Sequence, residues 1–288
     1  MALAFAAAVV AAGIAGSEPT LAQVPAPGQE GAGTGAPQIP PPSAAPQASA
    51  ALAAEPVEAS LSPECRVPGS KLYTLAPLRA VKSALRNDRA VRVLVIGASG
   101  GGSAFSPVTS YPVRLRSELE KQFKDVEVEV IHRALSGEIG AGAAGLVRAA
   151  TAEIGPDLVF WQVGTNDALA RVDLDEFADA LDETVSWLKS HEIDVVLVDP
   201  QYTTTLGTDE HYASIVRVVG AAAGRNKVPL VLRYEAMKYL AGKGGNRSVG
   251  GFALNNLGKR CIAEHVARAI AVAVVSDDPP VPAGTPTR

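Results

Sequence analysis

Three residues in separate parts of the chain, Ser99, Gly137 and Asn166, have the chemistry that acyl transfer requires. A serine hydroxyl is a nucleophile when a neighbouring base activates it. A glycine lets a backbone N–H approach a substrate oxygen closely, and an asparagine amide can donate a hydrogen bond to a developing oxyanion. The residue types therefore predict Ser99 as the nucleophile, with Gly137 and Asn166 in an oxyanion hole.

Five short apolar segments would position these residues. They alternate with stretches of helical patterning, which predicts a parallel sheet covered by helices on both faces. The predicted strands are residues 91–96, 126–131, 158–163, 194–198 and 229–232. Binding sites in such sheets lie beyond the carboxyl ends of the strands. Because Ser99, Gly137 and Asn166 follow the first three strands, we expect them to meet at that edge.

The glycine-rich run at residues 97–103 has a second interpretation, as a phosphate-binding loop. It fits neither G-x-G-x-x-G nor G-x-x-x-x-G-K-[ST] in its functional context, and no lysine follows it. We therefore do not expect a nucleotide site there.

Three blocks of the sequence resemble a known family. They are Gly97-Ala98-Ser99, Ser136-Gly137-Glu138 and Gly164-Thr165-Asn166-Asp167, and they resemble the first three blocks of the SGNH (GDSL-like) hydrolases. The resemblance implies a flavodoxin-like three-layer α/β/α sandwich with a five-stranded parallel sheet. It implies serine ester hydrolysis without a cofactor or metal ion, with oxyanion donors at Ser99, Gly137 and Asn166. Ala98 departs from the family, which usually has Asp there.

The last block departs more seriously. The family has Asp-x-x-His before the final helix, and the matching positions here are Gly250 and Ala253. The general base and the carboxylate that orients it are both missing. A serine hydroxyl without a base is a weak nucleophile, and the loss of a triad member leaves only a modest rate acceleration.

Two other histidines are alternatives for the base. His132 stands at the end of the second predicted strand, where a loop-ordering hydrogen bond is the competing interpretation. His211 stands at the start of a helix after the fourth strand, where a solvated side chain is the competing interpretation. Asp167 and Tyr202 are candidate binding residues, although Asp167 could instead order its own loop.

The N-terminal part differs in composition from the rest. Residues 1–22 resemble a secretory signal peptide that lacks a positive start, and a disordered Ala-rich tail is the alternative. Residues 23–64 are rich in Pro, Ala and Gly and predict a disordered linker. We expect one hydrolase-like domain at residues 65–275 and a disordered tail at residues 276–288.

Two cysteines, Cys65 and Cys261, stand near the ends of the predicted domain. In an exported protein they would form a disulfide, which would stabilise the fold by about 4–5 kcal/mol in the chain-entropy model. Two free thiols are the alternative. The net charge of −4 argues against nucleic-acid binding as the main activity, and the apolar N-terminal run is too short to span a bilayer.

The sequence thus predicts an exported protein, periplasmic or secreted, that binds an acylated glycan, lipid or small ester ligand and hydrolyses it weakly or not at all. We expect no transmembrane span in the mature protein. The alternatives are an active esterase or deacetylase with His132 or His211 as a substitute base, and a purely structural tethered domain.

Overall fold

A computed structural model describes residues 60–97, 110–135, 137–243 and 256–276. The predicted signal peptide, most of the linker and nearly all of the C-terminal tail lie outside the described residues. Ser99, Gly250 and Ala253 also lie outside them.

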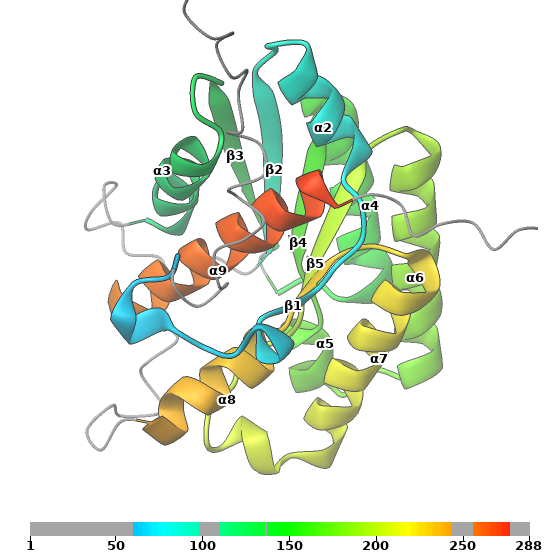
Figure 1. The fold of residues 1–288 in the computed structure, drawn as a ribbon. Coiled ribbons are helices and arrows are strands. Elements are labelled where there is room, and N and C mark those ends of the chain that lie inside the picture. Colours follow the sequence, from blue (N-terminus) through cyan, green and yellow to red (C-terminus); the bar gives the residue numbers. More distant parts are fainter. Residues whose placement is uncertain (1–59, 98–109, 136, 244–255, 277–288) are drawn as a thin grey trace, which may run out of the picture. The chain divides into compact units, whose positions relative to one another are not determined.

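The core of the fold is a six-stranded, mostly parallel sheet (Figure 1). Its strands are β1 (Tyr73–Thr74), β2 (Val91–Gly97), β3 (Val128–Ala134), β4 (Leu158–Gln162), β5 (Asp194–Val198) and β6 (Leu230–Val231). Their order in the sheet is β1-β6-β5-β4-β2-β3. The five parallel strands therefore follow the flavodoxin-like order 2-1-3-4-5, and the predicted α/β sandwich is confirmed.

The predicted number of strands was wrong by one. β1 pairs antiparallel with the outer side of β6, with Tyr73 opposite Val231. A strand of two residues is too short to show an alternating pattern, so nothing in the sequence marks it. The second predicted strand also extends further than expected, because β3 pairs with β2 as far as Ala134.

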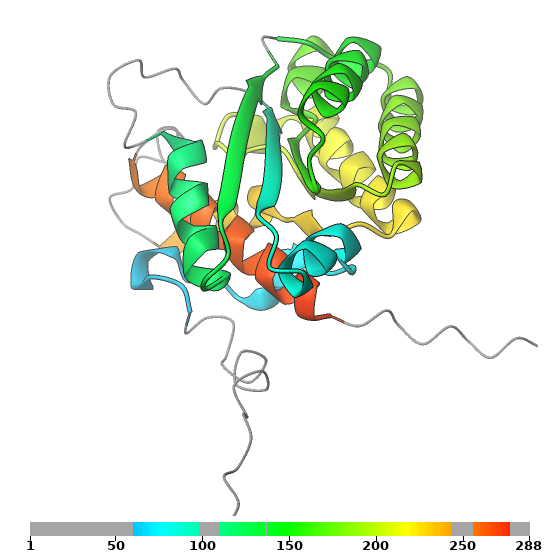
Figure 2. The ribbon, with the colours of Figure 1, turned by 90° about the horizontal axis from the view of Figure 1, so that it is seen from above.

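Helices cover both faces of the sheet (Figures 1 and 2). They are α2 (Arg79–Arg86), α3 (Tyr111–Gln122), α4 (Gly140–Ile154), α5 (Thr165–Ala170), α6 (Leu174–Ser190), α7 (Glu210–Asn226), α8 (Arg233–Lys243) and α9 (Asn256–Val275), with short 3₁₀ helices η1 (Pro63–Cys65), η2 (Gly69–Lys71) and η4 (Leu206–Thr208). Helices α2, α3 and α9 pack on one face, and α4, α6 and α7 pack on the other. Within the described residues, no helix has the length and apolar character needed to cross a membrane.

Side chains alternate between two cores along each central strand, as a strand buried on both faces requires. In β2, Leu94 and Ile96 belong to the core beneath α4, α6 and α7. Val93 and Val95 belong to the core beneath α2, α3 and α9. This alternation decides which side chains can reach a site on either face.

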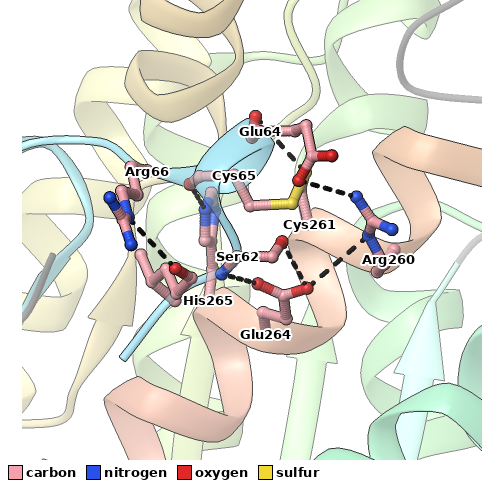
Figure 3. Close-up of a disulfide and its surroundings, with 9 residues drawn as sticks. Ser62, Glu64, Cys65, Arg66, Arg260, Cys261, Glu264 and His265 are labelled. Carbon is pink, nitrogen blue, oxygen red and sulfur yellow. Dashed lines mark hydrogen bonds and ion pairs between the residues drawn. A yellow bond between two sulfur atoms is a disulfide. The ribbon is translucent and has the colours of Figure 1, made fainter. Parts of the chain in front are cut away.

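A third apolar cluster joins the N-terminal part of the described chain to α8 and α9. At its centre Cys65 and Cys261 form a disulfide (Figure 3). The Nε2 atom of buried His265 lies 2.7 Å from the carbonyl oxygen of Cys65. Both the backbone N–H and the hydroxyl of Ser62 donate to Glu264, each at 2.8 Å. These contacts fasten the segment before β1 to the last helix.

Candidate functional site

A cavity of about 180 Å³ lies at the carboxyl edge of the sheet, where the sequence predicts a site. It is lined by the end of β4, the start of α5, the loop after β3, one side of α6 and residues that follow β5 and β6. Phe177 and Leu181 of α6 are buried and give the cavity an apolar wall. Polar groups from the strand ends face the same space, an arrangement common to sites for small ligands.

Asn166 is a polar residue of this cavity and was predicted from the sequence. It stands in the first turn of α5, directly after the end of β4. Its side-chain nitrogen donates to the carbonyl oxygen of Glu138 at 3.2 Å. Because the amide group carries two hydrogens, one remains for a ligand oxygen.

Asp167 also lines the cavity, and its carboxylate is engaged within the protein. It is 4% exposed, and its Oδ1 atom accepts a hydrogen bond from the Gly140 backbone at 2.8 Å. Burial raises the pKa of this carboxyl group, and hydrogen bonds from backbone N–H groups oppose the rise. Asp167 therefore joins the start of α5 to the start of α4 and holds Asn166 in place.

Gly137 has a positive φ of 82°, a conformation that favours glycine. Its N–H donates to the carbonyl oxygen of Leu135 at 2.7 Å. Gly137 is not among the residues that line the cavity. Its predicted role as an oxyanion donor would require that N–H to turn away from Leu135.

The predicted substitute bases do not line the cavity either. His132 lies within β3 opposite Val95, so it faces the side of the sheet covered by α2, α3 and α9. Burial, with a smaller contribution from the charge of Arg133, lowers the pKa of His132. His211 is the second residue of α7, and its Nε2 atom is buried without a hydrogen-bond partner in the described part of the chain.

Tyr202, the other predicted binding residue, packs against protein. Its ring meets that of Tyr234 edge to face, with centroids 5.2 Å apart. It is not among the residues that line the cavity.

The cavity also contains Trp161, Gln162 and Arg233, which were not predicted as site residues, and Gln201, from the stretch after the fourth predicted strand that was expected to line the cleft. Gln201 lies in the loop after β5, and Arg233 begins α8 shortly after β6. Both segments follow the carboxyl ends of parallel strands, where sites in such sheets are expected. The Nη2 atom of Arg233 donates to the Oε1 atom of Gln201 at 3.2 Å. The Nε atom of Arg233 is buried and has no hydrogen-bond partner among the described residues. Burial lowers the pKa of this guanidinium.

Asp199 lies next to this group but is directed toward the backbone. Its Oδ1 atom accepts a hydrogen bond from the Tyr234 N–H at 2.8 Å, at the start of α8. Burial raises the pKa of Asp199 to about 8, although the N–H of Tyr234 and the charge of Arg233 favour the ionised form.

Comparison with known proteins identifies one matching family. The profile of the non-GDSL lipase-like family matches residues 64–276. A search of curated proteins finds no match.

Among solved structures, TesA is 19% identical, with a TM-score of 0.53, and the match covers 63% of this chain and 99% of that one. A two-domain esterase, CEX, active on acetylated mannans is 17% identical, with a TM-score of 0.57 and coverage of 75% and 60%. The acetyl xylan esterase AlAXEase is 19% identical, with a TM-score of 0.51 and coverage of 61% and 98%. At these identities the likeness establishes the fold.

Proposed function

The chain belongs to the non-GDSL lipase-like family, and from that membership we propose that it binds an acyl ester in the cavity at the carboxyl edge of the sheet. The ligand is an acylated glycan, an acylated lipid or a smaller ester. The chain hydrolyses this ester slowly or not at all. The esterases of similar fold that act on acetylated mannans or xylan make an acetylated glycan a reasonable first ligand to test.

The observation that carries this proposal is the position of Asn166. Asn166 lines a cavity that is also lined by apolar side chains of α6. An ester has the same two characters, a carbonyl oxygen that accepts hydrogen bonds and an acyl group that is apolar. An amide donor in a partly desolvated cavity binds such an oxygen more strongly than it would in water.

Slow or absent hydrolysis follows from the sequence of the last block. Ser99 supplies a hydroxyl, but Gly250 and Ala253 replace the residues that would activate it. None of the described residues that line the cavity is a histidine. Without proton transfer, the hydrogen-bond donors alone give only a small acceleration.

Hydrolysis of p-nitrophenyl acetate and labelling by a fluorophosphonate test this proposal together. We expect wild type to show little turnover and little labelling, and the double variant Gly250→Asp/Ala253→His to gain both. Ser99→Ala in that double variant should remove the gain, because it removes the nucleophile. If the double variant stays inactive and acetylated sugars also fail to bind wild type, the ester-binding proposal is wrong.

The alternative is an active esterase with a substitute base. The retained Ser99, Gly137 and Asn166 motivate it, whereas the placement of His132 on the side of the sheet covered by α2, α3 and α9 speaks against that residue as the base. In that case wild type would hydrolyse the ester rapidly, and His132→Gln or His211→Gln would abolish the activity. Equal, low rates in wild type and both variants would exclude this alternative.

Export is the second part of the proposal. The disulfide between Cys65 and Cys261 supports it, because such bonds form and persist mainly in oxidising compartments. Fractionation of cells that produce the full chain tests it. We expect the chain in the periplasmic or secreted fraction with its disulfide formed, and a reduced chain in the cytosol would contradict export.

A further inference from the structure

Two residues that line the cavity, Trp161 and Arg233, carry buried hydrogen-bond donors that have no acceptor among the described residues. The indole N–H of Trp161, a residue 2% exposed, has no partner in the described part of the chain. The Nε–H of Arg233 has none either. Buried polar groups in folded proteins are nearly always hydrogen-bonded, so each unpaired donor calls for an explanation. A ligand that supplies acceptor oxygens would satisfy both.

The positive charge of Arg233 indicates that the ligand's acceptor group is negatively charged. Among the described residues no carboxylate forms an ion pair with its guanidinium, which donates instead to the neutral side chain of Gln201. Asp199 is the nearby acid, but it accepts from the Tyr234 backbone and its raised pKa favours the protonated form at neutral pH. A partly buried cation without a counter-ion is costly unless a ligand brings the opposite charge.

The other acids that line the cavity do not supply this charge. Asp167 is engaged by the Gly140 N–H. Glu138 is exposed, and its side chain lies against Gly142 in the first turn of α4. Neither of them forms an ion pair with Arg233 in the described part of the chain.

Strand order explains how the chain assembles these groups. The strands β6, β5 and β4 are neighbours in the sheet. Trp161 lies near the carboxyl end of β4, and Gln201 and Arg233 lie beyond the carboxyl ends of β5 and β6, so all three reach the same cavity. The guanidinium has a planar fork of donors that matches the two oxygens of a carboxylate.

We propose that the ligand carries a carboxylate next to its ester, as an acylated uronic acid does, and that Arg233 binds this carboxylate with help from the Trp161 indole. The inference rests on the proposed function and specifies its ligand class. Arg233 binds through the charged group, while Asn166 binds through the ester carbonyl. Neutral acetylated sugars are then weaker ligands, because they bring no negative charge to Arg233.

Isothermal titration of the full chain tests this with a matched pair of ligands. The probes are O-acetylated glucuronic acid and O-acetylated glucose. They share the ring and the ester, and they differ only at C6, which is a carboxylate in the acid and a hydroxymethyl group in glucose. We expect wild type to bind the acid at least about 10-fold more tightly. Arg233→Gln should remove this preference, so that the variant binds the acid and the neutral ester with similar affinity.

Arg217→Gln is the matched control, because Arg217 is an exposed arginine of α7 outside the cavity, and it should bind like wild type. Circular dichroism checks that each variant folds. If Arg233→Gln does not fold, Arg233→Lys replaces it. Lysine keeps the charge but lacks the planar fork, so the preference should fall severalfold without vanishing.

The outcomes separate this inference from the proposed function. Equal affinities of wild type for the two esters, or an unchanged preference in the arginine variant, would overturn the carboxylate proposal and leave ester binding intact. Tighter binding of O-acetylated glucose 6-phosphate than of the uronic acid would replace the carboxylate by a phosphate. Tight binding of glucuronic acid that does not depend on its acetyl group would support Arg233 and contradict the ester proposal.

Discussion

Asp199 carries a carboxyl group into the interior at the end of β5, where it is 2% exposed. Burial raises its pKa from an ordinary value near 3.8 to about 8. Between these two pH values the folded chain holds a proton that the unfolded chain has lost. The free energy of unfolding therefore decreases as the pH rises from about 4 to about 8, and this contribution is constant above that range.

Asp199→Asn tests this pH dependence. Asparagine keeps an oxygen for the Tyr234 N–H but does not ionise. We expect the variant to gain stability relative to wild type between pH 5 and pH 8, by about 1 kcal/mol or more. Urea unfolding followed by circular dichroism measures it, with Asp175→Asn at the exposed start of α6 as the control for loss of one charge. Parallel pH profiles of wild type and Asp199→Asn would contradict the raised pKa.

Single residues of the site differ in how well the sequence marks them. Asn166 and Asp167 could be predicted, because Gly-Thr-Asn-Asp directly follows an apolar strand. Trp161 and Arg233 could not, since an aromatic residue within a strand is usually core and an arginine after a strand is usually solvated. Their significance lies in missing partners, which depend on the packing of segments far apart in the chain. The hydrogen bond from the Gly137 N–H to the Leu135 carbonyl oxygen likewise depends on the backbone conformation that the loop adopts.

At the scale of elements, the turn from β4 into α5 depends on Gly164. Its φ is 91°, and a Cβ there would lie 2.9 Å from a side-chain carbon of Ile215 in α7. Both the backbone conformation and the close approach of α7 require glycine. The same turn places Asn166 at the cavity, so strain at this position would also disturb the site.

Gly164→Ala should destabilise the fold by about 2 kcal/mol or more, through positive φ and overpacking against α7. Gly145→Ala is the matched control. Gly145 lies within α4 with nothing near its Cβ position, so alanine there should stabilise the fold by about 0.5–1 kcal/mol. Urea midpoints measure both changes, and two changes of the same sign would contradict this account.

Helix α2 was missing from the sequence prediction. Helix α2 has no side-chain cap of its own, and the carboxylate of Asp194 in β5 accepts from the backbone of Arg79 and Val81, each at 3.0 Å. A cap supplied from so far along the chain leaves no local signal. The long helices α4, α6, α7 and α9 coincide with the stretches of helical patterning between and after the predicted strands, because an amphipathic pattern over several turns is a local property.

At the scale of the whole domain, the disulfide joins two residues that are far apart in the sequence. Cys65 and Cys261 are separated by 196 positions in the sequence. Closing so long a loop restricts the unfolded chain strongly, by about 5 kcal/mol in the chain-entropy model. The surrounding cluster holds the two segments together as well, since Cys65 is fully buried and Cys261 is 2% exposed.

Removal of this bond should lower the free energy of unfolding by about 2–5 kcal/mol, and the cluster should still permit folding. The double variant Cys65→Ser/Cys261→Ser measures it in urea, and wild type in reductant should match the variant. A loss below about 1 kcal/mol would show that the cluster alone holds the segments together.

The two edge strands of the sheet, β1 and β3, differ in what discourages them from pairing with another molecule. On one side β1 adds only two residues outside β6. On the other, β3 is seven residues long, and in the described part of the chain its outer side has no strand beside it. There Glu129 pairs with Arg92 at 2.8 Å, and Arg133 pairs with Glu153 at 2.7 Å. A very short edge strand and charged side chains on an edge strand both discourage edge-to-edge pairing between molecules. We therefore expect the folded domain to resist aggregation through either edge of its sheet.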